Sequence, residues 1–201
     1  MTRIVAGEFG GRTLHVPPRG TRPTSDRVRE AIFSRLEHHG ALRGARVLDL
    51  YAGSGALGLE AVSRGAAHAT LVDAARSAVE MGRRNARDIG AHGVEVVHEK
   101  AERFVATPPV KSWDLVFLDP PYDVRDETVA SVLEHLATTR AVTRDTLVVV
   151  ERATRSAEPV WPAGWEPDTS KAYGETTVHY AFAGVADGGD HDRAVGRAVL
   201  R

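Results

Sequence analysis

The spacing of apolar residues changes at Arg46, and from there two patterns alternate along the chain. Short runs of consecutive apolar residues are typical of buried strands, whereas apolar residues that recur every three or four positions are typical of helices. Their alternation favours an α/β fold, with a mostly parallel sheet that carries helices on both faces. We expect strands at 46–50, 69–72, 94–98, 115–118 and 147–150, and helices at 56–63, 75–89 and 129–136.

Both ends of the chain depart from this alternation. Two short strand-like runs, residues 3–6 and 14–16, flank a glycine-rich stretch and predict a hairpin. A loop rich in Pro and Gly follows, and a helix then reaches about His38. Residues 161–182 predict an antiparallel hairpin at the sheet edge, and the polar stretch after Gly184 predicts a disordered tail. We therefore divide the chain into an N-terminal extension (1–45), an α/β domain (46–183) and a tail (184–201).

Composition narrows the possible functions. The 201 residues are 42% apolar and 26% charged, an ordinary globular balance, and no apolar run reaches the roughly 18 residues that span a membrane. The first residues lack the apolar stretch of a signal peptide, so we expect a cytoplasmic protein. The chain has no cysteine, which excludes disulfides, cysteine-ligated zinc and thiolate nucleophiles.

Charge is unevenly distributed, although the net charge is −1. Residues 1–46 contain nine Arg against four Asp or Glu, a balance of +5, so the remaining residues carry −6. A basic end on a nearly neutral protein is expected when one face contacts nucleic acid, but a solvated arginine-rich surface gives the same count. The histidines show no metal-ligand spacing, and we predict no metal site.

The sequence Gly53-Ser-Gly-Ala-Leu-Gly58 matches the dinucleotide pattern G-x-G-x-x-G, and Asp73 follows where a ribose ligand would lie. Asp49 argues against a nicotinamide oxidoreductase, because a carboxylate at the end of the preceding strand would repel a pyrophosphate. S-adenosylmethionine carries an ammonium, a sulfonium and no phosphate, so the same carboxylate would attract it. Alternatively, the glycines merely permit a tight turn. Residues 100–102 follow the third strand, where a loop could cover the adenine.

The second candidate motif is Asp119-Pro-Pro-Tyr122, which follows the strand expected at 115–118. The prolines stiffen the loop and remove two donors, so the Asp119 carboxylate and the Pro120 carbonyl can each accept a hydrogen bond from an exocyclic amine. Tyr122 can stack on the ring that carries the amine. Alternatively, the loop is only a strand-ending turn. Without cysteine, methylation at cytosine C5 is excluded, whereas amine methylation needs no thiolate.

These motifs resemble those of class I methyltransferases that act on exocyclic amines. More specifically, the segments 3–12, 21–33 and 173–177 resemble the RsmD family, which methylates guanine N2 in bacterial small-subunit ribosomal RNA. The resemblance covers about residues 1–183 and implies a Rossmann-like, seven-stranded sheet with one antiparallel edge strand, preceded by an N-terminal hairpin and helix. Because DNA adenine-N6 methyltransferases share the cofactor and Asp-Pro-Pro-Tyr motifs, another nucleic-acid amino methyltransferase is the alternative.

The resemblance also implies roles for particular residues. The cofactor would be S-adenosylmethionine, and the partner would be 16S ribosomal RNA in an assembling small subunit, bound by a monomer. Residues expected to bind the cofactor are Thr24, Asp49, Ala52, Gly53, Gly55, Asp73, Ala101 and Asp119. Those expected to hold the reacting base are Asp119, Pro120, Pro121 and Tyr122. From the basic N-terminal extension, those expected to contact RNA phosphates are Arg3, Arg12, Arg19, Arg22 and Arg27.

Overall fold

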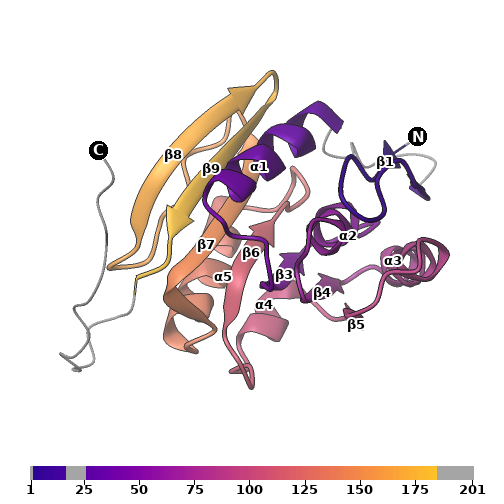
Figure 1. The fold of residues 1–201 in the computed structure, drawn as a ribbon. Coiled ribbons are helices and arrows are strands. Elements are labelled where there is room, and N and C mark those ends of the chain that lie inside the picture. The colour runs from indigo at the N-terminus through magenta and orange to yellow at the C-terminus, as the bar shows by residue number, and fades with distance from the viewer. Residues whose placement is uncertain (1, 17–25, 185–201) are drawn as a thin grey trace, which may run out of the picture.

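The computed structural model describes residues 2–16 and 26–184. Seven strands form its main sheet, in the order β5 (Val94–His98), β4 (His68–Asp73), β3 (Arg46–Leu50), β6 (Trp113–Leu118), β7 (Val142–Ala153), β9 (Thr176–Phe182) and β8 (Glu166–Tyr173) (Figure 1). The first five strands in this order are parallel to one another. The predicted α/β fold is confirmed, with its switch in strand order between β3 and β6.

The antiparallel part of the sheet lies at one edge. β9 runs antiparallel to β7 and to β8, so β9 is the reversed strand and β8 is the outer one. β7 begins at Val142, earlier than the predicted 147. Val142 is buried, but the three residues after it are polar and exposed, so they interrupt the apolar run although the strand continues. The apolar run reveals only the part of β7 that is buried on both faces.

Helices cover both faces of the sheet. On one face, α1 (Asp26–His38), α2 (Ala56–Ser63) and α3 (Arg76–Asp88) pack in one apolar core, and on the other α4 (Ala101–Val105) and α5 (Asp126–Thr138) pack in a second (Figure 1). α1 contributes Ile32, Phe33 and Leu36 to the first core, all at most 1% exposed. α1, which belongs to the N-terminal extension, thus shares its core with the α/β domain.

The N-terminal hairpin exists but is shorter than predicted. β1 (Thr2–Arg3) pairs with β2 (Thr13–Leu14), whereas the strands were expected at 3–6 and 14–16. The difference arises because the backbone after Arg3 bonds to α2: Val5 N and Ala6 N donate to the Glu60 carboxylate at 2.7 and 3.0 Å. Gly7 then approaches α2 so closely that a Cβ would lie 2.0 Å from the Ser63 carbonyl oxygen.

Candidate active site

Three carboxylates lie at or near the carboxyl ends of three adjacent strands. In the strand register, Leu50 of β3 pairs with Val72 of β4 and with Leu118 of β6. The residues that follow those partners are Asp73 and Asp119, which therefore flank the start of the loop after β3 on its two sides. This is the edge of a parallel sheet at which α/β folds bind their ligands, and the two predicted motifs meet there.

The glycine loop, which we define as residues 51–55, has an unusual backbone. Gly53 and Gly55 have φ of 55° and 80°, and Tyr51 has φ of 62°, a conformation that is rare for an aromatic residue and typical of functional turns. Gly53 N donates to the Asp73 carboxylate at 2.8 Å. A Cβ at Gly53 would meet nothing within 4 Å. The backbone thus faces open space there, and a bound molecule could approach it closely.

Asp49 lies beneath the glycine loop and is only 1% exposed. One oxygen of its carboxylate accepts a hydrogen bond from Gly58 N in the first turn of α2, at 2.9 Å. Burial raises the pKa of Asp49 to about 7, and the negative charges of Asp119 and Asp73 add to the rise, although the Gly58 hydrogen bond opposes it. A cation placed among these carboxylates would favour ionised Asp49. The site is therefore electrostatically suited to a cationic cofactor and unsuited to a pyrophosphate.

The Asp-Pro-Pro-Tyr loop, residues 119–125, is stiff but open. Asp119 is partly buried and Pro120 is buried, while Tyr122 is 53% exposed. A turn closes the loop through a hydrogen bond from Val124 N to the Pro121 carbonyl, at 3.0 Å. The ring of Tyr122 is thus available to a flat molecule that enters from solvent.

The other predicted cofactor residues lie around the same edge. Ala52 N donates to the Val72 carbonyl at 3.0 Å, which ties the glycine loop to the end of β4. Ala101 is buried and begins α4, a helix that the sequence analysis did not predict, in place of a covering loop. Thr24 lies outside the described residues. The role of each residue toward a cofactor stays a prediction.

Three further residues shape the site and were missed by sequence reasoning. Tyr51 carries the rare backbone conformation, and its hydroxyl lies 3.5 Å from the Glu102 carboxylate. Arg152 of β7 is 6% exposed and donates to the Val124 carbonyl and the Asp126 carboxylate, at 2.9 and 2.6 Å. Asn85 of α3 is fully buried. For Asn85 a signal existed, since it is a polar residue one turn beyond Gly82 on the apolar stripe of its helix.

The arginines predicted to contact RNA differ in their surroundings. The Arg3 side chain is 69% exposed, and Arg27 is also exposed, at the start of α1. Arg12 is exposed too, but it also donates to the Ile89 carbonyl and lies over the Phe9 ring, 5.2 Å from its centroid. Arg19 and Arg22 lie outside the described residues.

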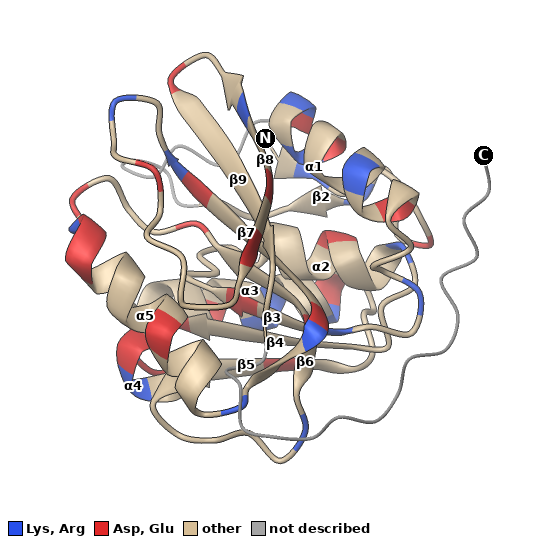
Figure 2. Cartoon of the chain, turned by 90° about the vertical axis from the view of Figure 1, so that its left-hand side faces the viewer, with Lys and Arg blue, Asp and Glu red and all other residues tan. Residues whose placement is uncertain are grey.

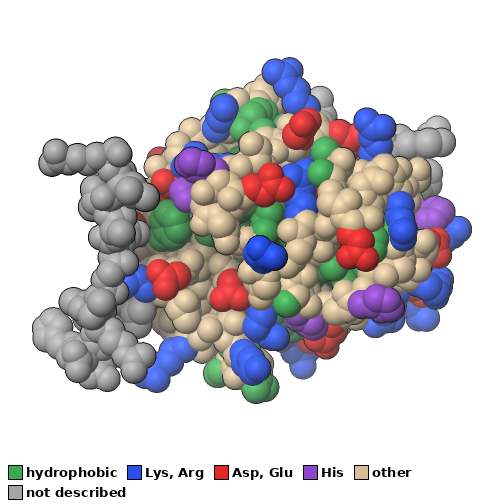
Figure 3. All heavy atoms as spheres, in the orientation of Figure 1, with side chains coloured by type: hydrophobic (Ala, Val, Ile, Leu, Met, Phe, Trp, Pro, Cys, Tyr) green, Lys and Arg blue, Asp and Glu red, His purple; other side chains and the backbone are tan. Residues whose placement is uncertain are grey.

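The excess of positive charge counted over residues 1–46 is not all available at the surface. Arg29 is fully buried, where it donates to Asp26 at 2.8 Å and lies 3.8 Å from Glu60, and its burial lowers its pKa. Arg35 is paired with Asp168. On the face drawn in Figure 3, basic and acidic side chains are interspersed. The count therefore overstates the positive charge that this segment can offer a partner.

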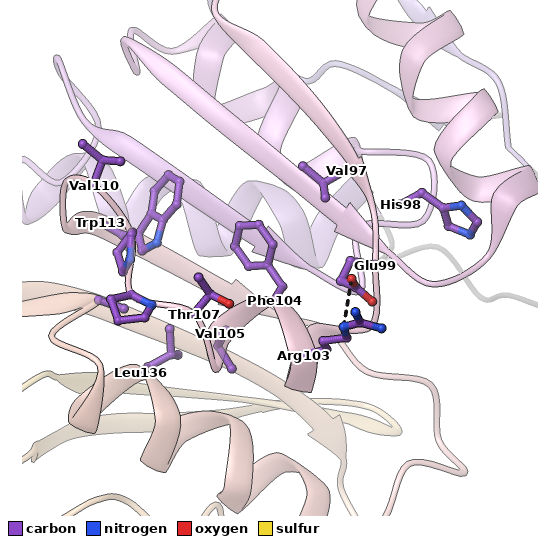
Figure 4. Close-up of a pocket in the computed structure, with 13 residues that line it drawn as sticks. Val97, His98, Glu99, Arg103, Phe104, Val105, Thr107, Val110, Trp113 and Leu136 are labelled. Atoms are coloured by element: carbon purple, nitrogen blue, oxygen red, sulfur yellow. Dashed lines mark ion pairs between the residues drawn. The ribbon is translucent and has the colours of Figure 1, made fainter.

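A pocket of about 500 Å³ lies beside the edge strand β5 and α4. Figure 4 shows the Glu99–Arg103 ion pair at one end of it and Val110 with Trp113 at the other. None of the predicted site residues lines it. Within residues 2–16 and 26–184, no helix is long and apolar enough to cross a membrane. In the same part of the chain, no cluster of three or more His, Asp or Glu could hold a metal ion.

Comparison with known proteins assigns nearly the whole described chain to one protein family. The family model described as Conserved hypothetical protein 95 matches residues 2–182. The ribosomal RNA small subunit methyltransferase D of Escherichia coli (strain K12) is 36% identical over 174 residues, which cover 86% of this chain and 85% of that protein.

Solved structures agree with this family. The structure of yhhF from Escherichia coli superposes with a TM-score of 0.83 at 34% identity and covers 92% of this chain and 99% of that one. Magnesium protoporphyrin IX methyltransferase from Synechocystis, solved with bound S-adenosylmethionine, shares the fold at 16% identity, with a TM-score of 0.61 and 78% of each chain covered. The chain therefore belongs to the Conserved hypothetical protein 95 family, the RsmD family of methyltransferases that its motifs predict.

Proposed function

We propose that this protein transfers a methyl group from S-adenosylmethionine to the exocyclic N2 amine of a guanine in 16S ribosomal RNA. The observation that carries the proposal is the meeting of Asp49, Asp73 and Asp119 beside the glycine loop, where their charges act on one another. Such a site would favour a cationic methyl donor and would hold an amine acceptor next to it. The curated relative's name, which specifies small-subunit ribosomal RNA, supports the class of substrate.

Each part of the glycine loop has a role toward the cofactor. Asp73 would accept hydrogen bonds from ribose hydroxyls while its other contacts hold Gly53 N and Ala75 N, both at 2.8 Å. Asp49 would supply the negative charge that a sulfonium and an ammonium require. Bound S-adenosylmethionine supplies an electrophilic methyl group. The protein's own contribution is to hold that methyl group in line with the acceptor nitrogen, which lowers the barrier by positioning.

The Asp-Pro-Pro-Tyr loop would hold the guanine. The Asp119 carboxylate and the Pro120 carbonyl would accept the two N2 hydrogens, which aims the nitrogen lone pair at the methyl group. As the new C–N bond forms and the C–S bond breaks, one N–H proton leaves toward the Asp119 carboxylate or solvent. Tyr122 is exposed enough to stack on the base once it is extruded from the RNA.

The RNA would approach over the N-terminal extension. Arg3 and Arg27 are exposed there and would contact phosphates, whereas the start of α5 carries Asp126 and Glu127 and would repel them (Figure 2). We propose that the protein acts as a monomer on an assembling small subunit, in the cytoplasm.

Nucleoside analysis tests this proposal. The protein is incubated with methyl-labelled S-adenosylmethionine and, separately, with free 16S ribosomal RNA, assembling small subunits and genomic DNA. We expect label in N2-methylguanosine from one or both small-subunit substrates. Label in N6-methyladenine from DNA would identify the alternative acceptor. Absence of S-adenosylmethionine binding by isothermal titration would refute the cofactor as well.

A further inference from the structure

The side-chain amide of Asn85 joins two segments that are far apart in the sequence. Its Nδ2 donates to the Ser54 carbonyl at 2.8 Å and to the His15 carbonyl at 2.9 Å, and its Oδ1 accepts from His15 N at 2.8 Å. Asn85 is 0% exposed. Both of its N–H donors and its acceptor are therefore used, and every one of these bonds goes to backbone outside α3.

On one side, the amide fixes the centre of the glycine loop. Ser54 lies between Gly53 and Gly55, which both have positive φ, so the loop is held in a backbone conformation that other residues rarely adopt. α3 also approaches the loop one turn earlier, because a Cβ on Gly82 would lie 4.0 Å from the Gly53 carbonyl oxygen. The orientation of the Ser54 peptide decides where the neighbouring loop atoms face.

On the other side, the amide anchors the end of the N-terminal hairpin. Two more contacts join the same stretch to the C-terminal end of α3: Arg12 donates to the Ile89 carbonyl, and His15 Nε2 lies 3.1 Å from the Asp88 carboxylate. In Figure 1 the N-terminal segment lies beside α2 and α3. Residues 12–15 are thus fixed to α3 at three points, of which only the Asn85 amide also reaches the glycine loop.

We propose that Asn85 is a positioning residue that makes the conformation of the glycine loop depend on the docking of residues 12–15. The amide cannot satisfy the Ser54 and His15 carbonyls together unless both segments are in place. Undocking the hairpin would therefore release the glycine loop and lower the affinity for S-adenosylmethionine. This would happen although none of the hydrogen bonds described above joins the hairpin directly to the glycine loop. This inference rests on the proposed function, because it assumes that the glycine loop binds S-adenosylmethionine.

Asn85→Asp is the sharpest variant. It keeps the size of the side chain and the acceptor for His15 N, but it replaces the donor that serves both carbonyls with an oxygen that repels them. We expect its dissociation constant for S-adenosylmethionine, measured by isothermal titration without RNA, to rise about tenfold or more. Arg12→Gln perturbs the docking from the surface end, and we expect a rise of about threefold.

The matched control is Thr146→Val. Thr146 is also 0% exposed and donates to a backbone carbonyl, that of Trp113 at 2.6 Å, but it lies near the amino-terminal ends of β6 and β7. The variant removes this bond and the one that the Thr146 hydroxyl accepts from Thr143 N at 2.9 Å, so we expect a lower melting temperature with unchanged S-adenosylmethionine affinity. A purely structural role for Asn85 predicts the same behaviour from Asn85→Asp.

A double-mutant cycle separates coupling from simple destabilisation. If the amide transmits docking, Arg12→Gln has no further effect on S-adenosylmethionine affinity in the Asn85→Asp background. Independent threefold and tenfold effects that multiply would overturn the proposal, as would unchanged affinity in Asn85→Asp. Should Asn85→Asp fail to fold, unchanged affinity in Arg12→Gln alone would overturn it. Failure of the wild type to bind S-adenosylmethionine would instead refute the proposed function.

Discussion

The two loops of the site are held in opposite ways. The glycine loop is fixed by side chains from three elements: Asp73 of β4 accepts from Gly53 N, Asn85 of α3 donates to Ser54, and Asp49 of β3 accepts from Gly58 N just beyond the loop. The Asp-Pro-Pro-Tyr loop is stiffened by its own prolines, and Arg152 contacts its far end. One loop is shaped by the fold around it and the other by its covalent structure.

This difference matches what each loop has to bind. A flexible cofactor with several polar groups needs many fixed backbone groups, which a loop gains by being held in place before the ligand arrives. A flat base needs hydrogen-bond acceptors for the edge that carries its amine and an aromatic ring to stack on its face. A stiff loop with an exposed tyrosine offers both and leaves room for the RNA. Variants of the glycine loop should therefore weaken cofactor binding, and variants of the Asp-Pro-Pro-Tyr loop should slow methyl transfer.

Asp119→Ala should give the largest loss of activity. It should also distinguish most clearly the role of the Asp-Pro-Pro-Tyr loop in methyl transfer from the role of the glycine loop in cofactor binding. Removal of the carboxylate leaves the acceptor amine without one of its two hydrogen-bond acceptors, so we expect kcat to fall by about two orders of magnitude or more. The dissociation constant for S-adenosylmethionine should rise by no more than about threefold, because Asp49 and Asp73 keep their charges and the contacts that hold the glycine loop are intact. Single-turnover methyl transfer and isothermal titration measure the two quantities.

Asp123→Ala is the matched control for Asp119→Ala. Asp123 is an exposed carboxylate in the same loop, so its removal changes the local charge by the same amount. We expect nearly wild-type kcat from this control. Equal losses in the two variants would mean that Asp119 acts through loop charge and not as an acceptor for the amine.

Arg152→Ala should give the next largest effect, on the same side of the comparison. The change removes the contact to Val124 at the far end of the Asp-Pro-Pro-Tyr loop and the contact to Asp126, the first residue of α5. We expect kcat to fall about tenfold because the base is held less well. S-adenosylmethionine affinity should not change. Arg155→Ala removes an exposed arginine shortly after the same strand and serves as the control. Weaker cofactor binding in Arg152→Ala would contradict the independence of the two loops.

The strand ends that carry the site could be predicted from the sequence, because they depend on local patterns of apolar residues. Apolar runs locate the strand ends, and the residues that follow a strand end must emerge at the sheet edge. Asp73 and Asp119 could therefore be placed before the structure was known. The residue pattern also predicted the N-terminal hairpin, but it placed the first strand too far along the chain, because residues 5–8 bond to α2 and not to a partner strand.

The supporting contacts could not be predicted in this way, because they join residues remote in sequence. Asn85 and His15 are 70 residues apart, and Arg152 and Val124 are 28 apart. A charge count likewise cannot tell an exposed arginine such as Arg3 from one that is buried like Arg29. The sequence could thus not predict the residues that hold each loop from outside, because only tertiary packing brings them next to it.

The pH dependence of cofactor binding gives the smallest expected effect and tests the electrostatic half of the comparison. The pKa of Asp49 is about 7 in the free protein, and a nearby cation favours its ionised form, so binding of S-adenosylmethionine should release a proton. We therefore expect affinity to fall about fivefold as pH is lowered from 7.5 to 6, and to level off above pH 7.5. Isothermal titration in buffers of different ionisation enthalpy measures both the affinity and the released proton.

Asp49→Asn is the control for this pH dependence. The pH dependence of the free energy of unfolding tests the raised pKa of Asp49 independently. Because the pKa of Asp49 is raised above its usual 3.8, the free folded protein holds this proton more tightly than the unfolded chain does. Protonated Asp49 therefore contributes its full stabilisation of the folded state below about pH 3.8, and this contribution is lost as pH rises through about 7. Asp49→Asn should remove that loss and bind S-adenosylmethionine more weakly, with little dependence on pH. A wild-type affinity that is flat between pH 6 and 7.5 would show that Asp49 only holds Gly58, and that the glycine loop selects its ligand by shape alone.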